Sequence, residues 1–176
     1  ITGRHPSQVL WDMSMWWPGL SADNRTIAEI LAEKGYDNAA FLNYHYFDAK
    51  RRMNQGYRVY DNSNARLHAG RDPASTRGSS SKQQADLSIK YLQNAKKPFH
   101  LWVHLYDPHY QYERHEGTPD FGDTPQDLYD HEVHFTDKAV GRIFDELRRL
   151  GHWDNTVVVV TGDHGEGFGE KDIDFH

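Results

Sequence analysis

The stretch TVVVVTGDHGE, residues 156–166, joins an apolar run directly to a polar turn. Its four valines are β-branched and the run is too short for a helix, so it predicts a strand. Because every position in the run is apolar, we expect a strand of a parallel sheet that is covered on both faces. Gly162 and Gly165 permit a tight turn, which presents Asp163 and His164 just beyond the strand.

A helix followed by a strand is predicted within residues 21–43. Thr26 and Glu29 form a capping-box pattern at the start of the helix, and Gly35 is placed to end it. Residues 39–42 are apolar and predict a short buried strand. The apolar stripe expected to face the core consists of Ile27, Ile30 and Leu31.

Two more helices are predicted further along the chain. The first covers residues 82–94 and leads into a strand over residues 99–105, which is rich in aromatic and β-branched side chains. The second covers residues 125–150, with Thr124 as the N-cap and Gly151 just past its end. The apolar faces expected on these two helices are Ala85, Ile89 and Leu92, and then Val133, Val140, Phe144 and Leu147.

This order of elements alternates helix and strand throughout. Such alternation predicts an α/β domain with a largely parallel sheet and right-handed crossovers. Residues 61–81 and 106–124 are polar and lack periodicity, so we expect surface loops there that shape a pocket. We expect residues 1–176 to form part of a single domain. Because the chain begins at Ile1 rather than Met, we also expect it to be a piece of a longer protein.

The overall composition narrows the range of functions. A formal net charge of −6 and a pI near 6.0 argue against binding nucleic acid, which needs clustered Lys and Arg. No apolar run approaches the ~20 residues of a membrane span. Cysteine is absent, which excludes thiolate metal ligands, whereas the chain has 12 histidines. Nothing in the composition indicates where the protein is located or how many copies assemble.

Polar residues follow three of the predicted strands. They lie at residues 43–45, 106–109 and 161–166. Ligands of open α/β sheets bind beyond the carboxyl ends of the strands, so these three segments are expected to meet on one side of the sheet. Their convergence would create a functional site.

Within these segments, Asp163 and His164 supply a carboxylate and an imidazole, which are good ligands for a divalent cation. The alternative is a polar turn in which Asp163 caps a backbone amide. His109 follows Pro108, which fixes the backbone, so His109 can contact an anionic oxygen or protonate a leaving group. The alternative for His109 is a solvent-exposed turn. We expect His104, inside a strand, to be packed or hydrogen-bonded instead.

Taken together, these features resemble the sulfatase family of the alkaline-phosphatase superfamily. The last matching segment, with its Asp-His-Gly-Glu turn, is specific, and the order of the others strengthens the match. The matching segments are residues 1–7 (ITGRHPS), 26–41, 54–57 (NQGY), 99–109 and 129–170. The resemblance implies an alkaline-phosphatase-like three-layer α/β sandwich, with a largely parallel sheet and helices on both faces.

The resemblance also implies roles for single residues. Asp163 and His164 would be metal ligands, and His109 would contact the sulfate or the leaving-group oxygen. His45 falls where many members place a histidine near the sulfate, although Asn43 replaces a lysine common there. The position of His176 matches a residue that reaches the substrate anion. Arg4 matches an arginine that supports the nucleophile loop.

The activity implied is hydrolysis of sulfate esters of small molecules or saccharides. The implied cation is calcium, and manganese or zinc stays open because imidazole suits those ions better. The formylglycine nucleophile of the family is expected about nine residues before Thr2. One alternative is a phosphoester or phosphonate hydrolase, or a phosphoglycerol-type transferase, of the same superfamily. Another is a domain without catalytic activity.

Overall fold

The computed structural model describes residues 1–14, 17–65, 81–110 and 112–169. The chain divides into two compact units, Ile1–Tyr106 and Asp107–His176. The elements follow one another in the order η1 (Pro6–Gln8), β1 (Trp11–Asp12), β2 (Gly19–Leu20), α1 (Ile27–Glu33), β3 (Asp37–Phe41), η2 (His45–Phe47), η3 (Ala49–Arg51), β4 (Val59–Asp61), α2 (Ser81–Leu92), β5 (Phe99–Val103), α3 (Pro125–Arg149) and η4 (Trp153–Asn155).

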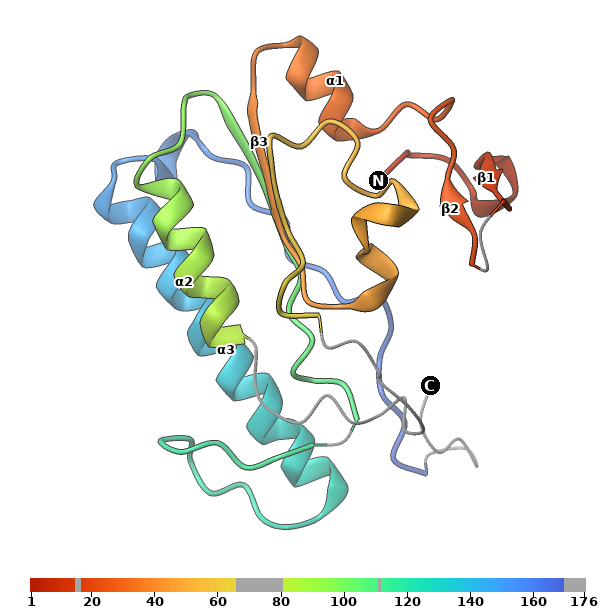
Figure 1. Cartoon of the computed structure of the whole chain (residues 1–176). Coiled ribbons are helices and arrows are strands. Elements are labelled where there is room, and N and C mark those ends of the chain that lie inside the picture. Colours follow the sequence, from red (N-terminus) through yellow and green to blue (C-terminus); the bar gives the residue numbers. More distant parts are fainter. Residues whose placement is uncertain (15–16, 66–80, 111, 170–176) are drawn as a thin grey trace. The chain divides into compact units, whose positions relative to one another are not determined.

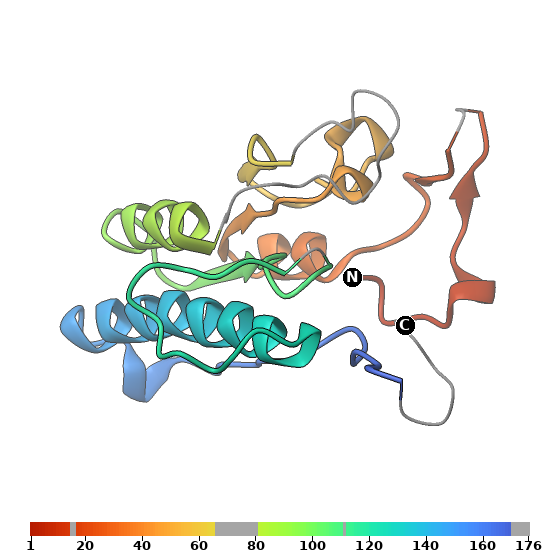
Figure 2. The same ribbon diagram turned by 90° about the horizontal axis from the view of Figure 1, so that it is seen from below.

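The first unit contains a three-stranded parallel sheet in the order β4-β3-β5. The central strand β3 is buried along its whole length. Its last residue, Phe41, lies opposite Asp61 of β4 and Val103 of β5, so the three strands end together. The predicted parallel pairing of the first two strands is therefore confirmed. The β1–β2 hairpin, which was not predicted, stands apart from this sheet (Figures 1 and 2).

Helices α1 and α2 cover opposite faces of this sheet. The Tyr91 hydroxyl of α2 donates to the Asp37 carbonyl oxygen at 2.7 Å, and the Tyr91 ring packs edge-on against Phe41. Asn38 follows Asp37 in the strand and points to the other face, where its amide donates to the Ala28 carbonyl oxygen of α1 at 2.6 Å. Figure 1 shows both helices beside β3. This is the expected α/β architecture, with helices on both faces of a parallel sheet.

The predicted ends of α1 are confirmed, because Thr26 and Glu29 form the capping box and Gly35 has a φ of +83°. Its predicted apolar stripe is wrong: Ile27 and Ile30 are exposed, and Ala28 is the buried residue.

Close backbone packing explains which side of α1 is buried. A Cβ atom on Gly56 would lie 2.3 Å from the Glu29 backbone nitrogen, so the chain around Gly56 touches the helix backbone. The Asn38 amide reaches the carbonyl oxygen of Ala28 on the same side. Only a small side chain fits at this contact, and that excludes the isoleucines from the buried face.

The second predicted helix is confirmed as α2, with Ala85 and Leu92 buried and Ile89 partly exposed. Most of the predicted loop 61–81 lies outside the described residues.

The second unit is built around α3. Thr124 is the N-cap and forms a capping box with Asp127, Pro125 is the first helical residue, and Gly151 follows with a φ of +68°. These predicted boundaries are confirmed.

The buried face of α3 differs in part from the predicted one. Leu147 is buried, whereas Val133 is 41% exposed and the neighbouring His131 and Glu132 are buried. The polar loop over residues 113–118 explains the difference, because it covers this turn of the helix and pairs with both side chains. Hydrogen bonding, rather than apolar contact, determines which side of the turn is buried.

The prediction of a buried strand at residues 156–160 is wrong. Val157 is 92% exposed and Val159 81% exposed, and within the described ranges no strand pairs with this segment. Valine favours extended backbone, but a strand also needs a hydrogen-bonded neighbour. The described residues provide no such neighbour, so the segment forms no hydrogen bonds of a sheet with them.

Candidate active site

The carboxyl ends of β3 and β5 meet in the first unit. The Nδ1 atom of His104 lies 2.6 Å from the Oδ1 atom of the buried Asn43, which confirms the hydrogen-bonded role expected for His104. Next to this pair, the rings of Tyr44 and Tyr106 stack at 4.7 Å between centroids. Two of the three segments expected to form a site are thus brought together.

His45 begins the short helix η2 beyond β3 and is partly exposed. Its ring lies between Tyr44, at 4.3 Å between centroids, and Tyr46, at 4.4 Å. Two aromatic neighbours restrict the rotation of the imidazole, so His45 has a defined orientation at this edge of the sheet. Its role toward a substrate stays a prediction.

The Asp163-His164 turn lies in the second unit and is open to solvent. The Oδ2 atom of Asp163 is 3.7 Å from the Nε2 atom of His164, and the two side chains are 85% and 46% exposed. The His164 Nδ1 atom lies 2.8 Å from the carbonyl oxygen of Gly165. A carbonyl oxygen can only accept, so Nδ1 carries the proton and Nε2 of the neutral ring carries the lone pair.

This arrangement fits part of a metal shell. Ligand atoms of one cation lie about 3–4 Å apart when each metal–ligand distance is about 2.0–2.5 Å, and Asp163 Oδ2 and His164 Nε2 satisfy that spacing. In the described parts of the chain, no three His, Asp or Glu side chains gather as a possible metal site. Asp163 Oδ1 also accepts the His164 backbone N–H at 3.1 Å, so the capping role weighed as the alternative is present as well.

Tyr112 links the loop after β5 to the same motif. Its hydroxyl donates to the Oε2 atom of Glu166 at 2.5 Å, and its ring packs against Tyr129 and Phe168. Burial, and then the Glu166 carboxylate, raises the pKa of Tyr112, so the phenol keeps the proton it donates. Sequence reasoning did not single out Tyr112; the aromatic residues within an otherwise polar loop were the available signal.

His109 also lies in this loop. Its Nδ1 atom is 2.6 Å from the Tyr110 carbonyl oxygen, which makes Nδ1 the protonated nitrogen and directs Nε2 away from the backbone contact. The ring is partly exposed, so a ligand can reach it. His109 and Asp163 belong to the same unit, and their joint action remains a prediction. His176 lies outside the described residues.

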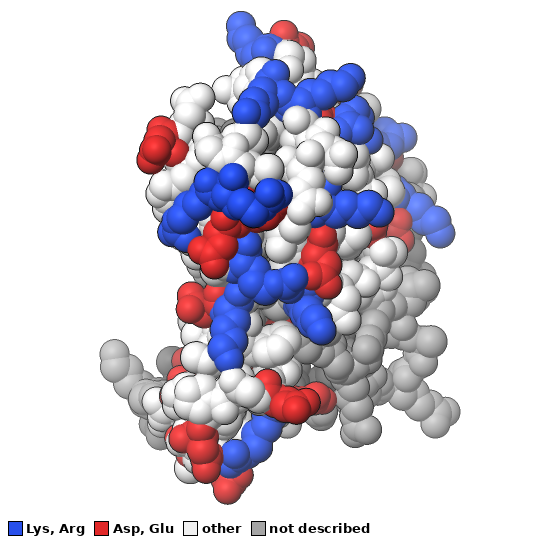
Figure 3. Space-filling view, turned by 90° about the vertical axis from the view of Figure 1, so that its left-hand side faces the viewer, with Lys and Arg blue, Asp and Glu red and all other residues white. Residues whose placement is uncertain are grey.

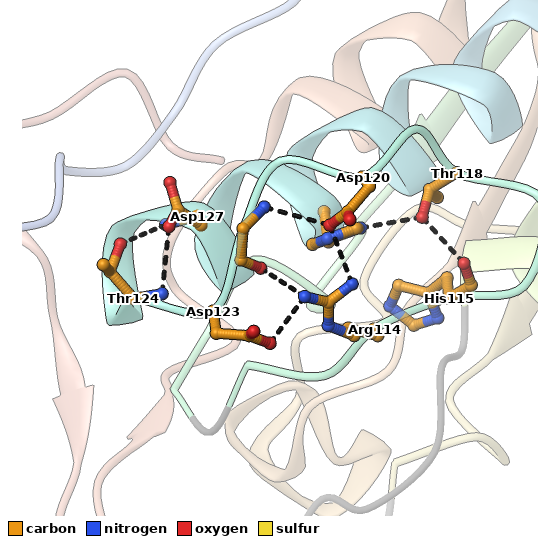
Figure 4. Close-up of polar contacts among 9 residues, drawn as sticks. Arg114, His115, Thr118, Asp120, Asp123, Thr124 and Asp127 are labelled. Atoms are coloured by element: carbon orange, nitrogen blue, oxygen red, sulfur yellow. Dashed lines mark hydrogen bonds and ion pairs between the residues drawn. The ribbon is translucent and has the colours of Figure 1, made fainter.

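A network around Arg114 shapes the next part of the loop (Figure 4). The Arg114 guanidinium donates to Asp120 at 2.9 Å, to Asp123 at 2.5 Å and to the Gly122 carbonyl oxygen at 2.7 Å. The Thr118 hydroxyl donates to the His115 carbonyl oxygen at 2.7 Å. These contacts lead the chain into the N-cap of α3.

The loop is fastened to α3 by buried polar side chains. Glu132 accepts the Glu113 backbone N–H at 2.7 Å and lies 2.5 Å from the His115 Nε2 atom. His131 Nδ1 lies 2.7 Å from the Thr118 hydroxyl. Burial lowers the pKa of His115, but the Glu132 carboxylate outweighs that effect and raises it above 6.5. His131 and Glu132 were missed from the sequence, because they lie on a helix whose predicted buried face contained Val133 instead.

The charged surface carries both signs. In Figure 3, Asp and Glu side chains lie among the Lys and Arg side chains of the face shown. Among the described residues, Arg149 pairs with Glu146 at 2.5 Å. Of the helices in the described ranges, not one combines the length and the apolar composition needed to cross a bilayer.

Comparison with known proteins places these features in a family. The model of the sulfatase family matches residues 1–176. Lipoteichoic acid synthase 2 of Bacillus subtilis (strain 168) is 28% identical over 82 residues, which are 44% of this chain and 13% of that protein. The uncharacterized sulfatase YdeN of Escherichia coli (strain K12) is 31% identical over 110 residues, 56% of this chain and 19% of that protein.

Solved structures show the same fold. The lipoteichoic acid synthase LtaP of Listeria monocytogenes matches with a TM-score of 0.52 at 19% identity, over 74% of this chain and 34% of that chain. A protein of the alkaline phosphatase superfamily from Vibrio parahaemolyticus matches with a TM-score of 0.52 at 22% identity, over 74% and 33%. This chain thus spans about a third of the length of these structures. It has an alkaline-phosphatase-like fold, and it belongs to the sulfatase family.

Proposed function

We propose that the protein containing this chain hydrolyses sulfate esters with a divalent cation held in part by Asp163 and His164. The observation that carries the proposal is the spacing of Asp163 Oδ2 and His164 Nε2, 3.7 Å apart on a turn open to solvent. The Nδ1–Gly165 contact supports it further, because it leaves the lone pair of the neutral ring on Nε2, next to the carboxylate. Small-molecule or saccharide sulfate esters are the proposed substrates.

When bound, the cation would supply Lewis-acid stabilisation of the oxygens of the transferring group. Calcium is the first candidate, and manganese or zinc is a candidate because of the imidazole ligand. His164 can ligate only as the neutral ring, so we expect metal affinity to fall at acidic pH.

The histidines have distinct proposed roles. His109 would act as the imidazolium ion: its Nδ1 proton stays with the Tyr110 carbonyl oxygen, and its Nε2 proton passes to the departing alkoxide, which leaves the neutral ring. His45 would hydrogen-bond an oxygen of the sulfate, held in orientation by Tyr44 and Tyr46. His176 would pair with the substrate anion.

A second function, phosphoglycerol-type transfer or phosphoester hydrolysis, is supported by a different observation. Lipoteichoic acid synthases are among the relatives, in both sequence and structure. Phosphate and sulfate monoesters have similar tetrahedral anions, so the same turn and histidines could serve either group. The two functions share the cation and differ in the group transferred.

The deciding experiment compares the kcat/KM of the full-length protein for hydrolysis of 4-nitrophenyl sulfate and of 4-nitrophenyl phosphate, in the presence of Ca²⁺, Mn²⁺ or Zn²⁺. We expect kcat/KM to be higher for the sulfate ester. A clear preference for phosphate would replace the first function with the second. Absence of turnover of both esters, with metal still bound, would favour a domain that has kept the fold without the chemistry.

A further inference from the structure

Arg51 lies between two aromatic side chains in the first unit. Its guanidinium carbon is 5.7 Å from the ring centroid of Trp17 and 5.3 Å from that of Tyr46. Both distances are within the range of a cation–π contact. Trp17 precedes β2, and β2 contacts η3, the short helix that ends at Arg51. Residues from two separate parts of the chain thus hold one guanidinium group.

The charge of Arg51 has no protein counterpart in the described part of the structure. No carboxylate lies within ion-pair distance of its guanidinium there, and the side chain is only partly exposed. Two nearby arginines differ: Arg52 pairs with Asp12 at 3.7 Å, and Arg58 pairs with the buried Asp37. Arg51 therefore presents planar N–H donors that no described acidic side chain uses.

This group lies next to the candidate site. The Tyr46 ring contacts both Arg51 and the ring of His45, the latter at 4.4 Å between centroids. Trp17 and Tyr46 are 51% and 46% exposed, so each has surface available to a ligand. An arginine and two exposed rings form one continuous polar and aromatic surface beside His45.

We propose that Arg51, Trp17 and Tyr46 form a subsite that binds a second sulfate or phosphate group of a saccharide substrate. A guanidinium pairs with tetrahedral oxyanions through two parallel N–H donors, and stacking on aromatic rings fixes its plane in advance. The exposed ring of Trp17 offers an apolar face for the sugar ring. The inference rests on the proposed function, because it takes the edge beside His45 as the side where substrate binds.

The test measures binding to the full-length protein by isothermal titration calorimetry. The probes are sucrose octasulfate and glucose 1,6-bisphosphate, which separate a sulfated from a phosphorylated ligand. R51Q should weaken binding of at least one probe about tenfold, the loss expected for a charge-assisted hydrogen bond. The matched control is K50Q, which removes the same charge from the neighbouring exposed residue and should change binding less than about twofold.

Equal weakening in R51Q and K50Q would mean that binding depends only on the net positive charge, and this would contradict the subsite. Wild-type affinity in R51Q, or no binding of either probe to the wild-type protein, would contradict it as well. If R51Q lowers the melting temperature, R51K takes its place; it keeps the charge, loses the planar donors and should still weaken binding. Turnover of 4-nitrophenyl esters by the same preparation is measured separately. If probe binding depends on Arg51 but the protein turns over neither ester, only the proposed function is contradicted. If the protein turns over an ester but probe binding does not depend on Arg51, only the subsite is contradicted.

Discussion

The His115 imidazole and the Glu132 carboxylate are joined at 2.5 Å, with only 10% and 4% of their side chains exposed. The ring of His115 also stacks on Phe135, at 4.0 Å between centroids. Because Glu132 belongs to α3 and His115 to the loop after β5, this contact fixes the loop that carries His109 to the helix behind it. The position of the loop that carries His109 thus depends on the buried pair of His115 and Glu132.

Replacing Glu132 with alanine should destabilise the protein by about 1–3 kcal/mol. The variant removes the acceptor of the Glu113 N–H and of the His115 ring. Because Glu113 is exposed and water can replace the acceptor of its N–H, the cost comes mainly from the one buried group, the His115 ring. Urea denaturation of the full-length protein measures the change. Glu116→Ala, an exposed residue of the same loop, is the control and should alter stability by less than about 0.5 kcal/mol. Equal effects in the two variants would show that the pair does not anchor the loop.

The same pair predicts a pH dependence. The pKa of His115 is raised in the folded protein above 6.5, because the Glu132 charge outweighs burial. The folded state therefore holds the proton more tightly than the unfolded state. As long as Glu132 is ionised, the contribution of this pair to the free energy of unfolding is complete below about pH 6.5, and it is lost as the pH rises through the folded pKa of His115. An NMR titration of the His115 ring should give a midpoint above 6.5, which Glu132→Gln lowers; a wild-type midpoint at or below 6.5 would contradict the account.

Glycine at position 56 should be required for a steric reason. Gly56 and Gly35 share a φ of +83°, so alanine is strained at both, by about 1 kcal/mol. Only at Gly56 would the new Cβ meet backbone, 2.3 Å from the Glu29 nitrogen, whereas Gly35 has open space. Gly56→Ala should therefore lower the free energy of unfolding by at least about 1 kcal/mol more than Gly35→Ala. Similar losses in both variants would mean that the α1 contact relaxes easily.

The hydrogen bond between Tyr112 and Glu166 predicts an effect on metal binding. Tyr112→Phe keeps the ring contacts and removes the donor, so the turn after Gly162 loses one support. We expect metal affinity of the full-length protein to fall about tenfold, as for other outer-shell contacts. Tyr110→Phe, in the same loop, should leave the affinity unchanged. Wild-type metal affinity in Tyr112→Phe would show that this hydrogen bond does not support metal binding.

Local signals in the sequence were reliable where the structure depends on local contacts. The capping boxes of Thr26 and Thr124 and the terminating Gly151 are set by residues within one helical turn, and the structure has each of them. The buried faces depend on distant segments instead. The close approach of Gly56 to α1 and the polar loop over His131 are not encoded in the periodicity of either helix.

The strand prediction at residues 156–160 failed for a related reason. Valine has a high propensity for extended backbone, but the hydrogen bonds of a sheet need a neighbouring strand from elsewhere in the chain. For the candidate site, the sequence singled out Asp163, His164 and His109 as residue types with suitable chemistry. It could not find Tyr112 or Arg51, because their importance comes from partners 54 and 34 positions away, Glu166 and Trp17.

The proposed chemistry depends above all on Asp163 and His164 holding a divalent cation together. The most direct test is the metal content of the full-length protein, measured by mass spectrometry after dialysis, in wild type, Asp163→Asn, His164→Gln and the exposed control Asp154→Asn. The account predicts close to one cation per chain in wild type and in Asp154→Asn, and loss of most of it in the other two variants. Full metal content in both Asp163→Asn and His164→Gln would contradict it.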